Sequence, residues 1–267
     1  MTIKLTEVYR YPIKSLAGIP MKASLVEKYG LENDRCMMLV DQNGLFISQR
    51  KNPELARIKV LSDSSNIIIE SSGQKAITIG EFSFSKLKMK VEVWGDFCEA
   101  YIASEEVNLW FSQLLQQKVF LVKYDFNKPR ATDLNYSQPS DIVSFADGFP
   151  ILMISQGSLD DLNSRLDEPV SMLNFRPNLV IDGCDAFAED DWKTIRVGSV
   201  VFDLVKACSR CVLTTVNPTT GVKSNKGQPL KTLSSYRRTK MGVVFGMNLI
   251  PRSSGKVRPG DVLKVLS

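Results

Sequence analysis

The chain has 267 residues and a mass of 29.9 kDa, enough for one large domain or two small ones with their own hydrophobic cores. Hydrophobic residues make up 43% of the chain and charged residues 24%, as in an ordinary soluble globular protein. The 34 basic and 29 acidic residues leave a net charge of +5. This weak, scattered excess does not predict a nucleic-acid-binding protein.

The chain contains no histidine. This excludes His-ligated zinc enzymes, His-ligated haem proteins and hydrolases with a Ser-His-Asp triad. Any chemistry must therefore come from other polar side chains or from a bound cofactor.

The N-terminus and the cysteines predict the compartment. The first residues, MTIKLTEVYRYPIK, lack the apolar core and cleavage site of a signal peptide. The sequence contains no run of about 18 apolar residues, so no membrane span is predicted. The five cysteines are an odd number and are dispersed along the chain, which favours reduced thiols over a disulfide framework. We expect a cytoplasmic protein without a membrane partner.

Short strands dominate the predicted elements up to residue 94. Residues 1–10 alternate between apolar and polar side chains. Residues 37–40, a turn at 41–44 and residues 45–48 predict a hairpin. Further strands are predicted at residues 58–61, 67–70, 76–79 and 91–94.

Two segments have a helical period instead. Ser104 is placed to cap a helix that begins at Glu105. The apolar stripe of this helix is Val107, Trp110, Phe111, Leu114 and Leu115. A second helix is predicted from Ser158, with Asp161 as its capping-box partner. Its stripe is Leu159, Leu162 and Leu166.

Strands return in the last third of the chain. Residues 194–197 and 200–205 predict a tight hairpin, and residues 211–216 and 262–266 predict two more strands. The polar segment 129–139 has a proline at each end and predicts an exposed loop or linker. The sequence therefore predicts a mainly β, barrel-like protein that divides near residues 120–125.

The most distinctive local motif is Cys208-Ser-Arg-Cys211. A thioredoxin-like redox pair would begin a helix, and a zinc site would need a second pair or histidines; the strand-like flanks and the composition favour neither. Two interpretations remain open. The cysteines are a buried structural pair, or one thiolate ligates a soft or high-valent transition metal and is stabilised by Arg210.

Several basic side chains lie beside the ends of predicted strands. Lys14 and Ser15 follow the first strand, Arg35 lies in a turn, and Arg176 lies in the loop Asn174-Phe-Arg-Pro-Asn178. Each one alone is typical of a solvated surface charge. Together they predict an anion pocket, in which lysine acts as a point charge and arginine as a planar fork.

Ser155-Gln156-Gly-Ser158 comes directly before the second predicted helix. A helix N-terminus with free N–H groups, a glycine and hydroxyls is suited to phosphate, and a simple N-cap is the alternative. Neither G-x-G-x-x-G nor G-x-x-x-x-G-K-[ST] occurs, so no Rossmann dinucleotide site or P-loop is indicated.

Five motifs follow one another in a fixed order. They are Tyr11-Pro-Ile-Lys-Ser15, Asp34-Arg35, Asn174-Phe-Arg-Pro-Asn178, Cys208-Ser-Arg-Cys-Val-Leu-Thr-Thr-Val216 and Phe245-Gly-Met-Asn248. This set resembles the MOSC superfamily, the fold of the molybdenum cofactor sulfurase C-terminus. It is most similar to the mitochondrial amidoxime-reducing component and bacterial YcbX-type proteins. The resemblance implies a MOSC N-terminal β domain at residues 1–120 and a MOSC β-barrel domain at residues 121–267, with a few peripheral helices.

The resemblance also implies a site. In the family the second cysteine of C-S-R-C ligates molybdenum, which makes Cys211 the metal ligand and catalytic residue. The molybdenum cofactor (Mo-molybdopterin) would be contacted by Lys14, Ser15, Arg35, Arg176, Ser209 and Arg210. Ser155, Gln156 and Ser158 match the segment that lines the phosphate end of the cofactor.

Family members reduce small N-hydroxylated compounds such as amidoximes. The resemblance implies an oxidoreductase whose electrons come from a separate protein: a flavodoxin, a ferredoxin or a flavoprotein reductase. We expect this because the chain shows no ferredoxin extension of the YcbX type and no spare cysteines for a cluster. Pyridoxal phosphate binding enters only as a family-level description, and we expect neither that domain nor sulfurase activity here.

Three other functions stay open. The protein is a cofactor carrier without turnover, a sulfur-transfer protein that uses Cys208 or Cys211 as a persulfide, or a β-barrel interaction module for RNA. The carrier would hold molybdenum that does not cycle with substrate. The persulfide would release sulfur to cyanide, and RNA binding would depend on salt.

Overall fold

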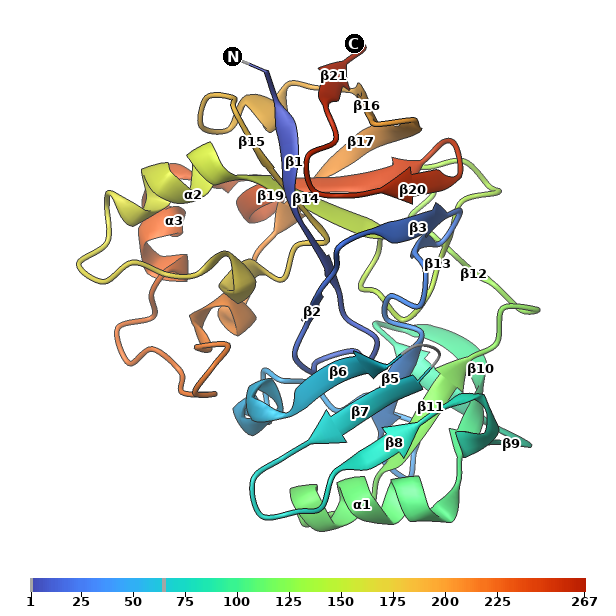
Figure 1. Cartoon of the computed structure of the whole chain (residues 1–267). Helices are drawn as coiled ribbons and strands as arrows, with labels where there is room; N and C mark the ends of the chain where they lie inside the picture. Colours follow the sequence, from blue (N-terminus) through green and yellow to red (C-terminus); the bar gives the residue numbers. More distant parts are fainter. Residues whose placement is uncertain (1, 64–65) are drawn as a thin grey trace.

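The computed structural model describes residues 2–63 and 66–267. Within these residues strands predominate and three α-helices are present, so the predicted mainly β class is confirmed. Figure 1 shows two bodies, of which the upper one contains both ends of the chain. None of the helices in the described ranges is long and apolar enough to cross a membrane.

The upper body is built on a nine-stranded sheet. Its strands are β1 (Lys4–Arg10), β2 (Ile19–Pro20), β14 (Ile151–Ser155), β15 (Leu179–Asp182), β16 (Thr194–Val197), β17 (Val200–Ser209), β18 (Arg238–Thr239), β19 (Gly242–Pro251) and β21 (Leu263–Val265). The order along the sheet is β2-β1-β15-β14-β19-β17-β16-β21, and β18 pairs with β19. Only the β14–β15 pair of this sheet is parallel among the described strands.

Smaller elements complete the upper body. A three-stranded sheet joins β20 (Gly255–Val257), β3 (Ser24–Glu27) and β4 (Gly30–Leu31), and β12 (Arg130–Ala131) pairs with β13 (Ile142–Val143). The helices are α2 (Gln156–Asn163) and α3 (Leu230–Tyr236). Single 3₁₀ turns are η3 (Met172–Phe175), η4 (Ala188–Asp190) and η5 (Val212–Thr215).

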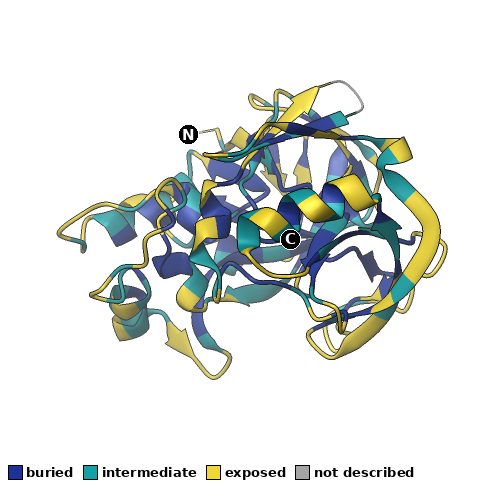
Figure 2. Ribbon diagram, turned by 90° about the horizontal axis from the view of Figure 1, so that it is seen from below, coloured by how far each residue is buried: buried dark blue, intermediate teal, exposed yellow. Residues whose placement is uncertain are grey.

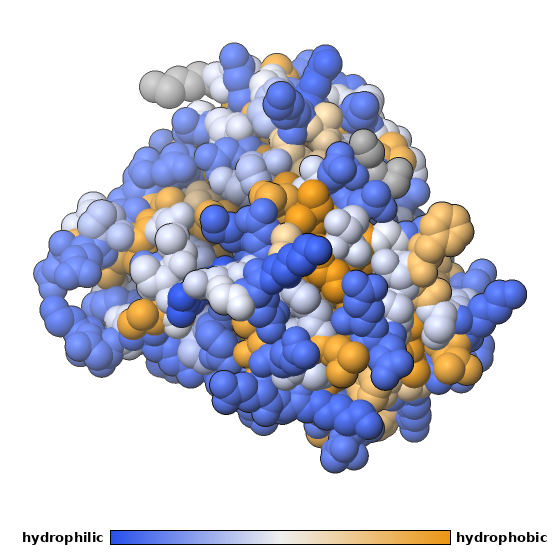
Figure 3. All heavy atoms as spheres, turned by 60° about the horizontal axis from the view of Figure 1, so that its bottom comes forward, coloured by the Kyte–Doolittle hydropathy of each residue, from blue (hydrophilic) through white to orange (hydrophobic). Residues whose placement is uncertain are grey.

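The lower body contains two sheets and one helix. Its elements are β5 (Met37–Val40), η1 (Pro53–Arg57), β6 (Lys59–Asp63), β7 (Asn66–Glu70), β8 (Ile77–Ile79), η2 (Glu81–Ser83), β9 (Phe84–Val93), β10 (Asp96–Ala103), α1 (Glu105–Leu115) and β11 (Phe120–Tyr124). The strand orders are β5-β11-β10-β9 and β6-β7-β8. The surface that Figure 3 brings forward is mainly hydrophilic with scattered apolar patches.

The first strands of the chain belong to the upper body. β1 pairs with β15 and β3 pairs with β20. Leu5 and Val8 of β1 are buried in one core cluster with Leu179 and Ile181 of β15, because the alternating pattern of β1 gives it one apolar face to bury. A division into residues 1–120 and 121–267 therefore follows the order of the chain but not the pairing of the sheets.

Helix α1 forms as its sequence predicts. The N–H of Val107 donates to the Ser104 hydroxyl at 3.5 Å, and Glu105 and Glu106 occupy the first turn, where negative charge is favourable. Val107 and Phe111 are buried. In Figure 2, seen from below, α1 lies in front of the sheets with buried and exposed residues alternating along it.

Three local predictions differ from the structure. Residues 45–48 form only isolated bridges, Val40 with Phe46 and Leu45 with Glu92, instead of a second hairpin strand. The second helix begins at Gln156 rather than at Ser158. The segment 129–139, predicted as a loop or linker, contains the short strand β12.

The predicted strand at residues 211–216 is wrong. The segment forms η5 instead, and its threonine hydroxyls donate to backbone carbonyls three residues earlier. The Thr214 hydroxyl donates to the carbonyl of Cys211 at 3.0 Å, and the Thr215 hydroxyl donates to that of Val212 at 2.7 Å. These local bonds offer the segment an alternative to a strand despite its β-branched composition.

Truncating the buried aromatic side chain of α1 tests the lower core. Phe111→Ala should lower the free energy of unfolding by about 3–5 kcal/mol, because it removes a fully buried ring and leaves a cavity. Leu109→Ala on the same helix is the control, since Leu109 is 51% exposed, and should change stability by less than about 0.5 kcal/mol. Urea denaturation measures both; equal losses would contradict the assigned core.

Candidate functional site

One pocket lies where the two bodies meet, with lining residues from both. It opens to solvent and is lined by charged, polar and aromatic side chains. Seven of the residues predicted from the sequence line it: Lys14, Ser15, Arg35, Arg176, Ser209, Arg210 and Cys211. Motifs spread over almost 200 positions of sequence therefore converge on one place.

The backbone is unusual around this pocket. Four lining residues that are not glycine have left-handed backbone angles: Ser15 with φ 74°, Arg35 with φ 48°, Trp94 with φ 55° and Arg176 with φ 54°. This region costs residues with a Cβ about 1–2 kcal/mol each. Such a concentration is typical of functional sites, where the surrounding fold holds side chains in fixed directions.

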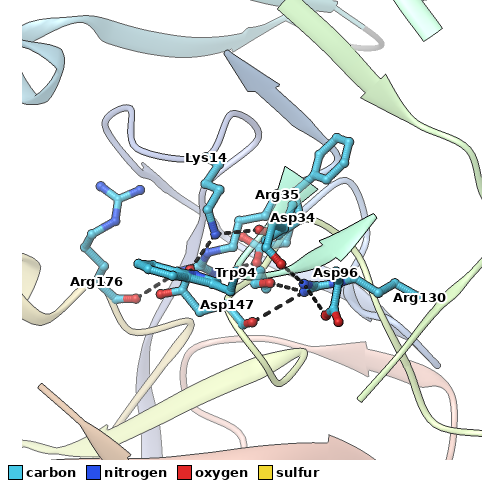
Figure 4. Close-up of polar contacts among 11 residues, drawn as sticks. Lys14, Asp34, Arg35, Trp94, Asp96, Arg130, Asp147 and Arg176 are labelled. Carbon is cyan, nitrogen blue, oxygen red and sulfur yellow. Dashed lines mark hydrogen bonds and ion pairs between the residues drawn. The ribbon is translucent and has the colours of Figure 1, made fainter. Parts of the chain in front are cut away.

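Lys14 is a buried cation that pairs with an exposed aspartate. Its Nζ donates to the carbonyl of Phe145 at 2.7 Å and pairs with Oδ1 of Asp147. The indole N–H of Trp94 donates to the same Oδ1 at 2.9 Å, as Figure 4 shows. Burial lowers the pKa of Lys14 although Asp147 opposes the shift. Partial desolvation in the pocket raises the pKa of Asp147, but the charge of Lys14 and the hydrogen bonds from Lys14 and Trp94 outweigh it and hold that pKa below its ordinary value.

Arg35 and Arg176 lie over the ring of Tyr11. Their guanidinium carbons are 4.5 and 4.3 Å from the ring centroid. Burial raises the pKa of Tyr11 to about 12, so this ring stays neutral at pH 7. Its hydroxyl is buried without a hydrogen-bond partner among the described residues.

Arg35 and Arg176 differ in the groups that balance their positive charges. Arg35 donates to Asp34 Oδ2 at 2.5 Å and to Asn178 Oδ1 at 3.0 Å. Arg176 has only the side-chain oxygen of Gln49, at 3.4 Å, and no carboxylate within residues 2–63 and 66–267. Burial lowers the pKa of Arg176 to about 10, which still leaves it charged at pH 7. It is therefore a cation available to an anionic ligand.

Hydrogen bonds from Ser209 and Arg210 fix the backbone directly before Cys211. Arg210 donates from Nε and Nη2 to the carbonyl of Phe245 at 2.8 and 2.6 Å, and from Nη1 to the carbonyl of Phe175 at 3.0 Å. The Ser209 hydroxyl donates to the carbonyl of Met241 at 2.8 Å. These bonds fix the turn after β17 against β19 and the η3 segment.

The two thiols of the C-x-x-C motif differ in environment. Both are free. Cys208 is partly buried near the end of β17, and burial raises its pKa although Arg210 opposes the shift. Cys211 is exposed and stands directly before η5. Both thiols line the pocket, and Cys211 is the more accessible of the two.

Ser155, Gln156 and Ser158 are not at this pocket, which corrects the prediction that they line it. The hydroxyls of Ser155 and Ser158 are fully buried and donate to the carboxylate of Glu189 at 2.9–3.1 Å. Gln156 donates to Asp160. Residue Leu152, near the opposite end of β14, lines the pocket instead. A buried carboxylate thus occupies the place beside α2 where a phosphate was expected.

Several lining residues were missed from the sequence. Asp147, Trp94, Gln49 and Arg50 all face the pocket. Asp147-Gly148 is a turn signal, and Trp94 precedes the glycine of the turn between β9 and β10. An acidic or aromatic residue in such a turn is worth testing as a site residue. Their convergence with Lys14 depends on long-range folding, which turn signals do not reveal.

The residues present fit an anionic cofactor that carries a soft metal. Among the cations that line the pocket, Lys14 and Arg35 are each paired with an aspartate, and Arg210 donates to backbone carbonyls. Arg50 and Arg176 have no carboxylate partner in the described part of the chain. Unpaired guanidinium groups are suited to phosphate. The exposed Cys211 thiol is the type of ligand that soft metals accept. Fold and site together define a two-body β protein with a cationic pocket between the bodies.

Comparison with known proteins places this class in a family. Residues 2–118 match the MOSC N-terminal beta barrel domain, and residues 140–264 match the MOSC domain. The chain is 32% identical to mitochondrial amidoxime-reducing component 1 of Homo sapiens, over 98% of this chain and 82% of that protein. It therefore belongs to the MOSC family, as its motifs predict.

Two further relatives agree with this membership. Mitochondrial amidoxime reducing component 2 of Rattus norvegicus is 34% identical, over 96% of this chain and 81% of that protein. The molybdenum cofactor sulfurase of Oryza sativa subsp. japonica is 32% identical, over 92% of this chain but only 32% of that protein. The chain thus resembles one part of the sulfurase and most of the amidoxime-reducing components.

The different environments of the two thiols predict their reactivity. At pH 8, iodoacetamide should label Cys211 at least about tenfold faster than Cys208, because burial raises the pKa of Cys208 and so lowers its thiolate fraction. Labelling of Cys208 should speed up as the pH rises from 8 to 10. Peptide mapping by mass spectrometry measures both rates.

The buried Cys36 serves as the internal control. Burial also raises its pKa, so it should react only after the protein is unfolded. Equal labelling of Cys208 and Cys211 in the folded protein at pH 8 would show that the described environments are wrong.

Proposed function

We propose that the protein is a molybdenum-cofactor-dependent reductase of N-hydroxylated compounds. The observation that carries this function is that the exposed Cys211 thiol and the uncompensated Arg176 guanidinium line the same pocket. The names of the relatives, amidoxime-reducing components and a molybdenum cofactor sulfurase, support it. No step in this proposal requires a histidine.

Each lining residue has a distinct part in holding the cofactor. Arg176 and Arg50 are the cations free to bind its phosphate, and Cys211 is the protein ligand for molybdenum. Lys14, Ser15 and Arg35 contact the cofactor from the N-terminal segment, while Ser209 and Arg210 hold the Cys211 turn in place. When bound, the cofactor supplies two-electron redox chemistry.

The reaction also needs protons. Reduction of an amidoxime to an amidine consumes two electrons and two protons and releases one water. Lys14 is the pocket residue suited to donate a proton, because burial lowers the pKa of its ammonium group and so makes the proton easier to release. Asp147 fixes the direction of Nζ through its ion pair. Solvent that enters the open pocket restores the proton.

The electrons come from a separate electron-transfer protein in this proposal. A flavodoxin, a ferredoxin or a flavoprotein reductase provides the required chemistry. The net charge of +5 favours the docking of an acidic carrier. We place the reaction in the cytoplasm, where the five free thiols stay reduced.

Metal content tests the cofactor site directly. Wild type made in a host that produces the cofactor should contain about one molybdenum per chain, with pterin fluorescence. Cys211→Ala should lose the molybdenum, whereas Cys208→Ala, which removes the neighbouring thiol of the same motif, should keep it. Elemental analysis of the three proteins measures this.

Turnover decides between a reductase and its alternatives. Wild type loaded with the cofactor should reduce benzamidoxime when dithionite-reduced viologen supplies electrons, and Cys211→Ala should not. Bound molybdenum without turnover would favour a cofactor carrier. Cyanide-released sulfur in protein without molybdenum would favour sulfur transfer through Cys211. Wild type with neither metal nor pterin would refute the reductase.

Replacing Arg176, which has no carboxylate partner among the described residues, should also reduce cofactor binding. Arg176→Gln should reduce retained molybdenum at least about tenfold, because it removes a charge-assisted bond to the cofactor anion. Arg165→Gln is the matched control, since Arg165 pairs with Asp161 on the outside of the protein. Gel filtration followed by metal analysis measures retention, and equal retention in the two variants would argue against an anion site at Arg176.

A further inference from the structure

An exposed apolar patch adjoins the cationic pocket. Phe149, which lines the pocket, contacts Tyr136, with ring centroids 6.3 Å apart. The Tyr136 hydroxyl donates to the sulfur of Met241 at 3.8 Å. Met241 is 42% exposed, and Leu134, in the same turn as Tyr136, is 61% exposed. We call this set of side chains the rim patch: Leu134, Tyr136, Phe149 and Met241.

The rim patch is connected to the turn that carries Cys211. The backbone carbonyl of Met241 accepts a hydrogen bond from the Ser209 hydroxyl at 2.8 Å, and Ser209 and Cys211 both line the pocket. Val212, which follows Cys211, is also exposed. A protein that covers the rim patch therefore lies beside the accessible thiol of the pocket.

Basic side chains flank the rim patch. Arg238 in β18 and Lys240 in the turn after it are exposed, and neither has a carboxylate partner in the described ranges. Lys206 lies over the ring of Tyr136, with Nζ 4.2 Å from the centroid, and it balances the charge of Asp133 at 3.6 Å. The cations beside the patch therefore outnumber the carboxylates that pair with them.

We infer that the rim patch and its flanking cations are the docking surface for an acidic electron-transfer protein. This assignment deepens the proposed function and rests on it. Protein interfaces combine an apolar centre, in which aromatic residues and methionine are enriched, with a polar rim. Complementary charge sets the orientation of the partners and the rate at which they associate. An acidic carrier that holds its redox group near its surface matches both features.

The docked carrier supplies electrons one at a time. Reduction of one benzamidoxime breaks its N–O bond, consumes two electrons and two protons, and yields benzamidine and water. Two flavodoxin hydroquinones are thereby oxidised to semiquinones. Because each electron requires its own encounter, the surface must release the oxidised carrier as readily as it binds the reduced one. A small patch with exposed charges suits such short-lived complexes.

Charge reversal in the loaded enzyme tests this surface. Combining Arg238→Glu with Lys240→Glu should lower the second-order rate constant for oxidation of reduced flavodoxin at least about tenfold at low salt, because attraction becomes repulsion. The difference from wild type should shrink as salt rises to about 0.5 M, where exposed charges are screened. Stopped-flow absorbance of the flavin in the presence of benzamidoxime measures both effects. Reduced plant-type ferredoxin serves as a second acidic carrier.

A second double variant controls for net charge. Lys256 in β20 and Lys264 in β21 are exposed, and neither lines the pocket. Combining Lys256→Glu with Lys264→Glu changes the net charge by the same amount as the reversal beside the rim patch. This control should keep most of the wild-type rate with flavodoxin, which separates a local charge effect from a global one.

The apolar part of the surface has its own variant. Leu134→Ser should raise the KM for flavodoxin at least about threefold, because it removes apolar area that the carrier buries. Leu134 is largely exposed in the free protein, so the substitution leaves the core intact.

Reduced methyl viologen separates docking from catalysis. The dye is a small cation that needs no protein interface, so charge reversal should not lower viologen-supported reduction of benzamidoxime. The KM for benzamidoxime in this assay should also stay at its wild-type value in Leu134→Ser.

Four results would overturn the assignment. Wild type that accepts electrons from neither flavodoxin nor ferredoxin would show that no acidic carrier docks. An equal loss in the Lys256 and Lys264 control would assign the effect to net charge. A raised KM for benzamidoxime with viologen in Leu134→Ser would assign the patch to the substrate. A wild-type dimer in gel filtration that Leu134→Ser dissociates would assign it to a second copy of the chain.

The proposed function and this assignment fail in different ways. Loaded wild type without viologen-supported turnover would refute the reductase itself. Turnover with viologen and with flavodoxin, but with equal flavodoxin kinetics in wild type and in the charge-reversed variant, would refute only the docking surface.

Discussion

The pocket depends on the hydrogen bonds of one partly buried arginine. Arg35 follows the turn before β5, and it donates to Asn178 Oδ1 at 3.0 Å and to the carbonyl of Arg176 at 3.1 Å in the upper body. Asn178 in turn accepts from the N–H of Leu152 and donates to the carbonyl of Tyr9. The guanidinium is always charged and presents its donors in a fixed fork. It therefore joins the two bodies and sets the direction of the Arg176 backbone in a single arrangement.

Apart from Arg210, whose donors serve backbone carbonyls, the cations of the pocket fall into two groups according to whether a carboxylate balances their charge. Lys14 is paired with Asp147, and Arg35 is paired with Asp34. These ion pairs fix the positions of the side chains and add little net charge to the pocket. Arg176 and Arg50 keep their charge available, and burial of Arg176 strengthens its field because little water screens it. A pocket with every cation paired would not attract an anion, and one with none paired would be costly to fold. This division lets a stable site remain suited to an anionic cofactor.

Local elements and site motifs could largely be predicted from the sequence, but the long-range hydrogen-bond partners of individual side chains could not. The Ser104 cap and apolar stripe of α1 follow from neighbouring residues, and the ordered motifs correctly bring Lys14, Arg35, Arg176 and Cys211 together. The role of Ser155 was missed because its partner, Glu189, is 34 positions away and no periodicity connects them. Asp147 was missed for the same reason: its meaning depends on Lys14, 133 positions away. The sequence shows which side chains are available, whereas the fold decides which of them are already occupied.

The C-S-R-C motif is best understood as a structural unit that presents one thiol. All three donor nitrogens of Arg210 with assigned bonds serve the backbone carbonyls of Phe245 and Phe175, so this arginine does not need a carboxylate to be held. A lysine would offer a single point charge and could not span both carbonyls with the same planar geometry. Cys208 ends in a partly buried position near β17, and the turn that follows directs only Cys211 outward. The two cysteines therefore stand at the end of β17 and directly before η5, and the second thiol is the more accessible of the two.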